Sequence, residues 1–190
     1  MNSDGERVDE RLWTLRHEVL WRIDVSQLYH RKRERFCDFW DRAFKAVAVI
    51  GGSAALYRIG AGDASTAASN TRVLLVATSI VTVTSTVSLV FALSERARKH
   101  SELAASFKKL EAEIMLAGET AFNERSINAW RAKRAELEGA EPPALYALTK
   151  ICELELHVAN GTPELAPTVT LLERLFAQFW SFGPKKKTTS

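Results

Sequence analysis

Residues 73–94 read VLLVATSIVTVTSTVSLVFALS and contain no charged side chain over 22 positions. At about 1.5 Å per residue, a helix of this length is roughly 33 Å long, which is enough to cross a hydrocarbon core of about 30 Å. Charge returns abruptly after it, with Glu95-Arg96-Ala97-Arg98-Lys99-His100. The segment is therefore predicted to be a membrane-spanning helix.

A weaker apolar segment precedes it. Ala46–Tyr57 is free of charge for 12 residues, about 18 Å of helix, and alone this length suits the buried core helix of a soluble protein. Lys45 and Arg58 can extend their aliphatic stems and place their charges at the headgroups. We therefore expect a first span over about residues 43–60, with a cytosolic helical protein as the alternative.

Between the two segments lies a stretch of small and polar residues, 61–72. Because such a connection is short, the two helices should be antiparallel neighbours. Gly51 and Gly52 fall within small-xxx-small patterns that permit close helix contact in membranes. The prediction is a two-helix transmembrane hairpin over 43–94 with an outer loop at 61–72.

Hydroxyl side chains are concentrated on one face of the second span. With about 100° per residue, five of the seven Ser and Thr residues between positions 78 and 88 fall within an arc of about 120°. The opposite arc is apolar and β-branched. The hydroxyl face could pack on another helix or line a pore. These candidate residues are Thr78, Ser79, Thr82, Ser85 and Thr86.

Basic residues predict the orientation. Seven Lys or Arg residues lie between positions 22 and 45, two lie between the segments, and five lie in the 17 residues after the second. This bias places both termini of a multi-pass protein in the cytoplasm. Residues at the ends of the segments are candidates for interfacial or pore-mouth charge: Lys45, Arg58, Arg72 and Glu95. A basic run is a candidate contact for anionic lipid headgroups: Arg31, Lys32, Arg33 and Arg35.

Amphipathic helices flank the apolar segments. Apolar periodicity predicts helices in 1–42, in one run continuing into the first span, and in 95–182, including a last helix at 168–182. They are expected to pack together as a cytosolic helical bundle, so the fold class is all-α. The tail, 183–190, is expected to be disordered. A heptad-like seam for helix packing is predicted at His100, Leu103, Phe107, Leu110 and Ile114.

Catalytic and metal-binding patterns are absent from the sequence. There is no HExxH, P-loop or GxSxG pattern, and the two cysteines are far apart. His30 is interpreted as a solvated histidine, and Cys37 and Cys152 as core thiols. We therefore expect no enzyme and no cofactor. Nucleic acid is not an expected partner, because the basic run has no interleaved aromatic residues and acidic residues follow it at once.

Three pieces of sequence, taken in order, resemble one known family. They are His30-Arg-Lys-Arg-Glu-Arg-Phe-x-Asp-Phe-Trp-Asp41, Leu93-Ser-Glu-Arg-Ala-Arg-Lys-His-Ser-Glu-Leu103, and Glu141-Pro-Pro-Ala-Leu-Tyr-Ala-Leu148 leading to Cys152-x-x-Glu155. Over about residues 15–182 the chain is similar to the SLATT family, the two-transmembrane effector domain associated with SMODS and SLOG domains in prokaryotes. Leu154 departs from the asparagine expected before the glutamate.

The resemblance implies a membrane effector of a nucleotide-signal-dependent anti-phage system. Such a protein would lie in the inner (cytoplasmic) membrane, associate into homo-oligomers, and form a pore or disrupt the membrane. Its implied partners are membrane lipids and a nucleotide-second-messenger synthetase or sensor encoded nearby. The alternative is a membrane scaffold without a pore, which recruits a cytosolic partner through its helical seam.

Overall fold

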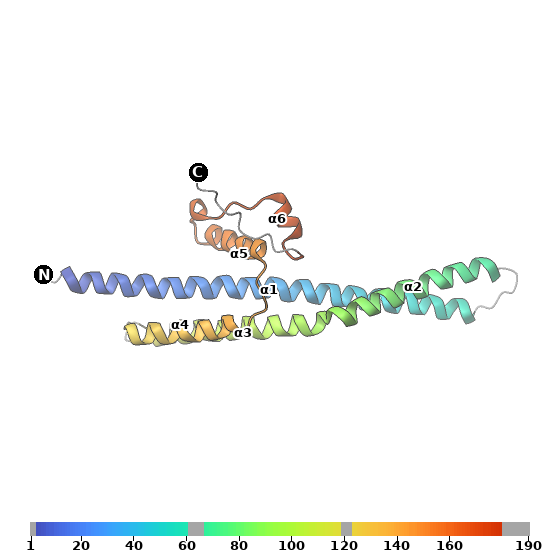
Figure 1. Cartoon of the computed structure of the whole chain (residues 1–190), viewed down its shortest axis with the longest axis horizontal. Coiled ribbons are helices and arrows are strands. Elements are labelled where there is room, and N and C mark those ends of the chain that lie inside the picture. The colour runs from blue at the N-terminus through green and yellow to red at the C-terminus, as the bar shows by residue number, and fades with distance from the viewer. Residues whose placement is uncertain (1–2, 61–66, 119–122, 180–190) are drawn as a thin grey trace. The chain divides into compact units, whose positions relative to one another are not determined.

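The computed structural model describes residues 3–60, 67–118 and 123–179, and all regular structure in these ranges is helical (Figure 1). The chain divides into two compact units, one formed by residues 1–33 with 100–190 and the other by residues 34–99. The first helix, α1 (Ser3–Gly60), is continuous through both. This agrees with the predicted uninterrupted run into the first apolar segment, which contains no proline.

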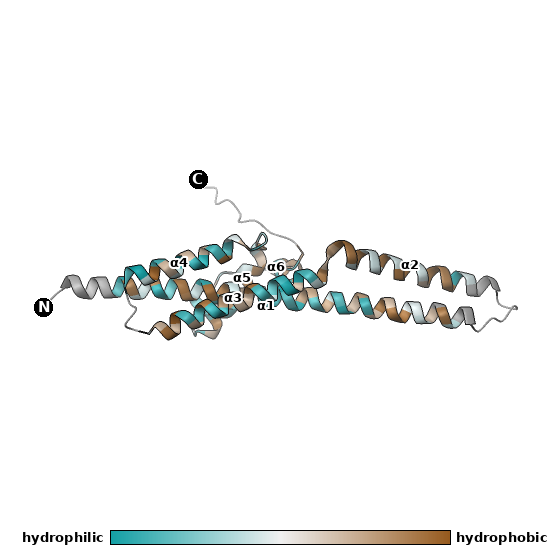
Figure 2. Cartoon of the chain, turned by 90° about the horizontal axis from the view of Figure 1, so that it is seen from below, coloured by the Kyte–Doolittle hydropathy of each residue, from teal (hydrophilic) through white to brown (hydrophobic). Residues whose placement is uncertain are grey.

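In the unit of residues 34–99, the second half of α1 contacts α2 (Ala67–Phe91). α2 is mostly hydrophobic along its length (Figure 2). Four of its half-buried positions recur at helical spacing on the face that meets Gly51 of α1: Leu74, Ala77, Val81 and Thr84. The helix begins earlier than expected, so Ser69 and Asn70, predicted as loop, are helical. The remaining predicted loop residues, 61–66, lie outside the described residues.

A single residue separates α2 from α3 (Leu93–Ala117). Ala92 has φ 45°, the left-handed conformation that commonly ends a helix and that residues other than glycine adopt infrequently. Its carbonyl accepts a hydrogen bond from the Arg96 amide at 3.0 Å. The predicted span of 73–94 is therefore interrupted near its end, and its regular helix stops at Phe91.

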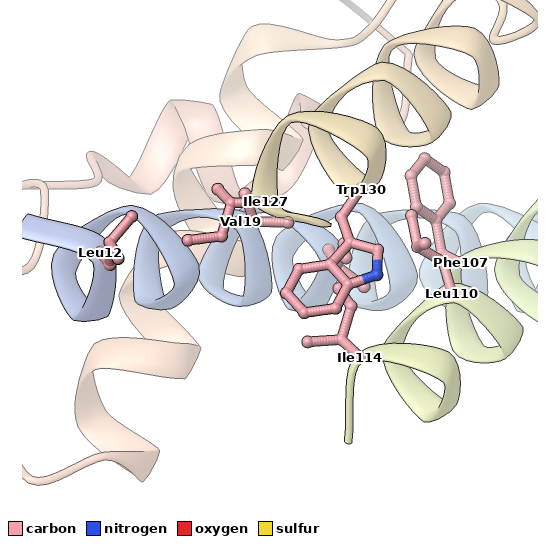
Figure 3. Packing of buried hydrophobic residues seen from close by; sticks show 8 residues of the cluster. Leu12, Val19, Phe107, Leu110, Ile114, Ile127 and Trp130 are labelled. Carbon is pink, nitrogen blue, oxygen red and sulfur yellow. The ribbon is translucent and has the colours of Figure 1, made fainter. Parts of the chain in front are cut away.

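The unit of residues 1–33 and 100–190 contains a core made by three helices (Figure 3). α1 contributes Leu12, Val19 and Ile23, and these meet side chains of α3 and of α4 (Glu124–Gly139). Trp130 of α4 packs into the same cluster. Burying a large apolar side chain stabilises a fold by about 1.5–3 kcal/mol, so this cluster is the main attachment between these segments.

A second core in this unit joins α1 to the C-terminal segments. Tyr29 and Val25 pack with α5 (Tyr146–Ala159) and with Ala177. The Leu145 amide donates a hydrogen bond to the Tyr29 hydroxyl at 3.1 Å, which positions the start of α5. A short 3₁₀ helix, η3 (Pro163–Leu165), and α6 (Leu171–Phe176) follow.

Two helix boundaries differ from the sequence predictions. The helix expected to begin at Pro142-Pro143 begins at Tyr146, since residues 142–145 form no regular structure and the backbone of Leu145 is extended. The last helix was expected over 168–182, and within its described part, residues 168–179, it is regular only over the six residues of α6. Its start is fixed at Thr170 by a capping box with Glu173. The predicted tail, 183–190, lies outside the described residues.

Candidate functional site

The apolar surface of residues 34–99 is the most unusual feature of the chain. Val76, Ile80, Val83 and Val90 of α2 are all exposed, as are large apolar side chains of the facing part of α1. Water-soluble proteins rarely expose a contiguous apolar surface of this kind. Among the described residues, one helical stretch, Thr71–Ala117, is long and apolar enough to cross a membrane, and none of its apolar window is buried. The first apolar segment, residues 43–60 of α1, is not long and apolar enough to meet the same criterion.

The five predicted hydroxyl residues of α2 are also exposed, and they do not form the contact with α1. Three of them donate hydrogen bonds to carbonyls one turn earlier: Thr78 to Leu74, Thr82 to Thr78, and Thr86 to Thr82, each at 2.8 Å. A threonine that bonds its own backbone is compatible with an apolar surrounding. We call these five residues, Thr78, Ser79, Thr82, Ser85 and Thr86, the hydroxyl stripe.

The charges at the ends of the apolar segments have different surroundings. Lys45 donates to Asp41 at 2.6 Å, and Asp41 is buried. Arg72 lines an apolar groove of about 510 Å³ between α1 and α2, together with Val47, Ile50 and Val76. Glu95 is exposed in the first turn of α3. The side chain of Arg58 lies outside the described residues.

The basic run of α1 is partly engaged by the protein itself. The Lys32 ammonium donates to Glu155 at 2.8 Å, and Arg33 donates from Nη1 to the Gln178 carbonyl at 2.8 Å. Arg31 and Arg35 are exposed. Two of the four predicted headgroup contacts are therefore already used to hold C-terminal segments of the chain.

The seam of α3 is fully used inside the chain. All five of its predicted residues are buried, namely His100, Leu103, Phe107, Leu110 and Ile114. Phe107, Leu110 and Ile114 belong to the core shared with α1 and α4. The seam therefore packs against the chain's own helices.

A buried histidine pair was missed from the sequence. The Nδ1 atoms of His30 and His100 are 2.9 Å apart, and Nε2 of His30 lies 3.1 Å from Oε1 of Glu141. The interpretation of His30 as solvated is wrong, because its ring is fully buried beside Phe107 and Tyr29. The sequence did contain an indication of this burial. His30 lies on the same helical face as the apolar residues Val19 and Ile23, so that face was expected to be buried.

The short distance between the two Nδ1 atoms indicates a hydrogen bond between the rings. Two Nδ1 atoms at 2.9 Å fit one proton between them, so one ring donates and the other accepts. Although Nε2 of His30 and Oε1 of Glu141 are close, neither makes a hydrogen bond, and both atoms are buried.

Other reactive groups give no site. Burial raises the pKa of the Cys152 thiol to about 12, so the thiolate that would act as a nucleophile does not form at neutral pH. Within the described ranges, no group of three His, Cys, Asp or Glu side chains could hold a metal ion. No family model, curated protein or solved structure matches the chain.

Proposed function

We propose that this chain is an inner-membrane effector whose segments 43–60 and 73–94 form a transmembrane hairpin, and that copies associate to breach the membrane. The observation that carries the proposal is the apolar surface of α2, of which the spanning window is unburied. Exposed valines and isoleucines are costly in water and favourable in lipid. A core helix of a soluble protein would have this surface covered.

Aromatic residues support a membrane entry point in α1. Phe36, Trp40 and Phe44 follow one another at four-residue spacing, with ring centroids 6.3 and 5.5 Å apart. Phe39 is exposed beside them. Aromatic rings are enriched at the membrane–water interface, and here they come just before the charge-free Ala46–Tyr57.

Association of copies follows from the geometry of the proposed hairpin. Two helices cannot enclose an aqueous path by themselves. The hydroxyl stripe is exposed and separate from the α1-facing positions of α2, so it is free to meet a neighbouring copy or water. The resemblance to the SLATT family supplies the proposed trigger, a nucleotide signal from a synthetase or sensor encoded nearby.

The scaffold alternative loses one of the two surfaces that it used. It placed a cytosolic partner on the seam of α3 and on the C-terminal helices, but the five seam residues are buried in the chain. A scaffold would have to rely on its C-terminal helices alone and leaves the exposed apolar surface of α2 unexplained, so the effector proposal is preferred.

The test is inducible expression in bacteria with a membrane-potential dye and a growth curve. The triple variant Thr78→Val, Thr82→Val, Ser85→Val should abolish depolarisation while leaving association intact. Thr84→Val is the matched control, because this hydroxyl also bonds its own backbone (Ile80 carbonyl, 2.8 Å) but lies on the α1-facing side. Cells that stay polarised under strong induction, and under phage challenge with the neighbouring genes present, would refute the proposal.

A further inference from the structure

The groove between α1 and α2 combines apolar walls with one charged residue. Its walls include Val47 and Ile50 of α1 and Val76 and Ile80 of α2, and its volume is about 510 Å³. Arg72 is the one charged side chain among the described residues that line it. We call this feature the interhelical groove. Its composition suits a ligand that is apolar along its length and anionic at one end.

The dimensions of the interhelical groove match one leaflet of a bilayer. Along α2 its lining begins at Arg72 and ends at Ile80, a rise of about 12 Å in a helix. One leaflet contributes about 15 Å to a hydrocarbon core of about 30 Å. Arg72 immediately precedes the charge-free stretch 73–94. If that stretch crosses a bilayer, Arg72 lies at the depth of the lipid phosphates and the groove lies beside the acyl chains of one leaflet.

We propose that the interhelical groove binds one phospholipid, with an acyl chain between α1 and α2 and the phosphate at Arg72. A guanidinium group can donate two parallel hydrogen bonds to a phosphate, which favours arginine for this contact. An acyl chain would gain dispersion contacts with the valine and isoleucine walls on both sides. The inference rests on the proposed membrane location and goes beyond the effector function, because it gives the hairpin a specific lipid site.

Charge favours a phospholipid over a second copy of the chain as the occupant. Neither 46–57 nor 73–94 contains an acidic residue. A second copy that inserted either apolar segment would therefore bring no counter-charge to Arg72 and would separate it from the lipid phosphates. No member of the hydroxyl stripe lines the described part of the groove, so copies that meet through the stripe would leave the groove open to lipid.

The test is native mass spectrometry of the full chain in a non-ionic detergent. The chain is titrated with phosphatidylglycerol or with a diacylglycerol that carries the same acyl chains, and the spectra count the lipids retained by each chain. Because diacylglycerol lacks the phosphate, the ratio of the two retentions isolates the phosphate contact. The native chain should retain phosphatidylglycerol severalfold more than diacylglycerol.

Arginine substitutions test the charged end of the groove. Arg72→Gln should bring the ratio of the two retentions close to one. Arg96→Gln is the matched control, because Arg96 is an exposed arginine just beyond the opposite end of α2, and this variant should keep the native ratio. A native ratio in Arg72→Gln, or an equal fall in both variants, would overturn the proposal.

Tryptophan substitutions test the apolar part of the groove. Val76 lines it and is 59% exposed, whereas the adjacent Leu75 is 61% exposed and is not part of the lining. Val76→Trp should fill the groove and lower phosphatidylglycerol retention severalfold, while Leu75→Trp should change it little. Equal losses would show that the lipid only coats the hairpin, which would overturn the proposal. So would dissociation of copies by Val76→Trp with unchanged lipid retention, since a second copy would then occupy the groove.

A carbonate wash of membranes that contain the same chain separates this inference from the proposed function. Release of the chain by carbonate would refute the membrane-spanning proposal. A chain that stays in the membrane, but retains phosphatidylglycerol no better than diacylglycerol, would refute only the phospholipid site at Arg72.

Discussion

A Cβ atom placed on Gly51 would lie 2.6 Å from Cγ2 of Val81, closer than carbon atoms can pack. The neighbouring Gly52 has no atom within 4 Å of the same position. α1 and α2 therefore approach closely at Gly51, and only one of the two adjacent glycines is required for the contact.

This asymmetry gives the first prediction. Gly51→Ala should destabilise the contact between α1 and α2 by about 1–3 kcal/mol, as overpacking does. Gly52→Ala should be neutral or stabilising by up to about 1 kcal/mol, because alanine is the better helix former. Thermal unfolding of the purified chain in detergent measures both. Adding Val81→Ala to Gly51→Ala should restore stability, and equal effects of the two glycine substitutions would contradict the close approach.

The histidine pair predicts that the contact between α1 and α3 depends on a buried polar interaction. The Nδ1 atoms of His30 and His100 are 2.9 Å apart, and both side chains are buried. His100→Leu would leave Nδ1 of His30 buried without this partner and should lower the stability of the folded chain by about 1–3 kcal/mol. His17→Leu, at an exposed position, should change the stability little. Thermal unfolding measures both variants.

Equal effects of His100→Leu and His17→Leu on the unfolding temperature would show that the histidine pair does not hold this contact.

Acid should release the attachment of α6. The amide of Thr170, followed by the Lys150 ammonium, lowers the pKa of Glu173 from 4.5 to about 2. A carboxyl with a depressed pKa stabilises the folded state above its ordinary pKa, and this contribution is lost as pH falls through the folded value. Exchange protection of 171–179 should therefore persist above pH 4.5 and decline between pH 4.5 and about 2. Glu173→Gln should remove this decline, and an identical decline in that variant would exclude Glu173 as its cause.

The thiol of Cys152 should be unreactive in the folded chain. Its pKa of about 12 reflects burial in the core with Tyr29 and Leu148. Iodoacetamide should leave it unmodified at mildly alkaline pH and modify it after denaturation, as mass spectrometry of the peptide would record. Rapid alkylation of the native chain would mean that this core opens readily.

The predictions made from periodicity describe the helices well. Apolar residues at helical spacing indicated the long first helix and the seam of α3, because a face that must be buried leaves a regular pattern. The same reasoning placed the hydroxyl stripe on one side of α2. Periodicity could not predict that α1 contacts a different side of α2. That side is set by the tertiary contact between Gly51 of α1 and Val81 of α2.

Three features depend on tertiary contacts and were not predicted from the sequence. His30 was predicted to be exposed to solvent because histidine is polar, although its position lies on an apolar helical face. Ala92 carries no helix-ending signal, since glycine usually occupies that conformation. The outward direction of Leu175 follows from Glu173 and Gln178 being bound by Lys150 and Arg33, residues distant in sequence.

The most direct test of the central claim is the accessibility of Val83→Cys in membranes that contain the full chain. A membrane-impermeant maleimide should not label it from either side of sealed vesicles, and the chain should remain in the membrane after a carbonate wash. Leu116→Cys should be labelled from the cytoplasmic side in the same vesicles. Labelling of Val83→Cys in intact vesicles, with release of the chain by carbonate, would contradict the placement of residues 73–94 in lipid.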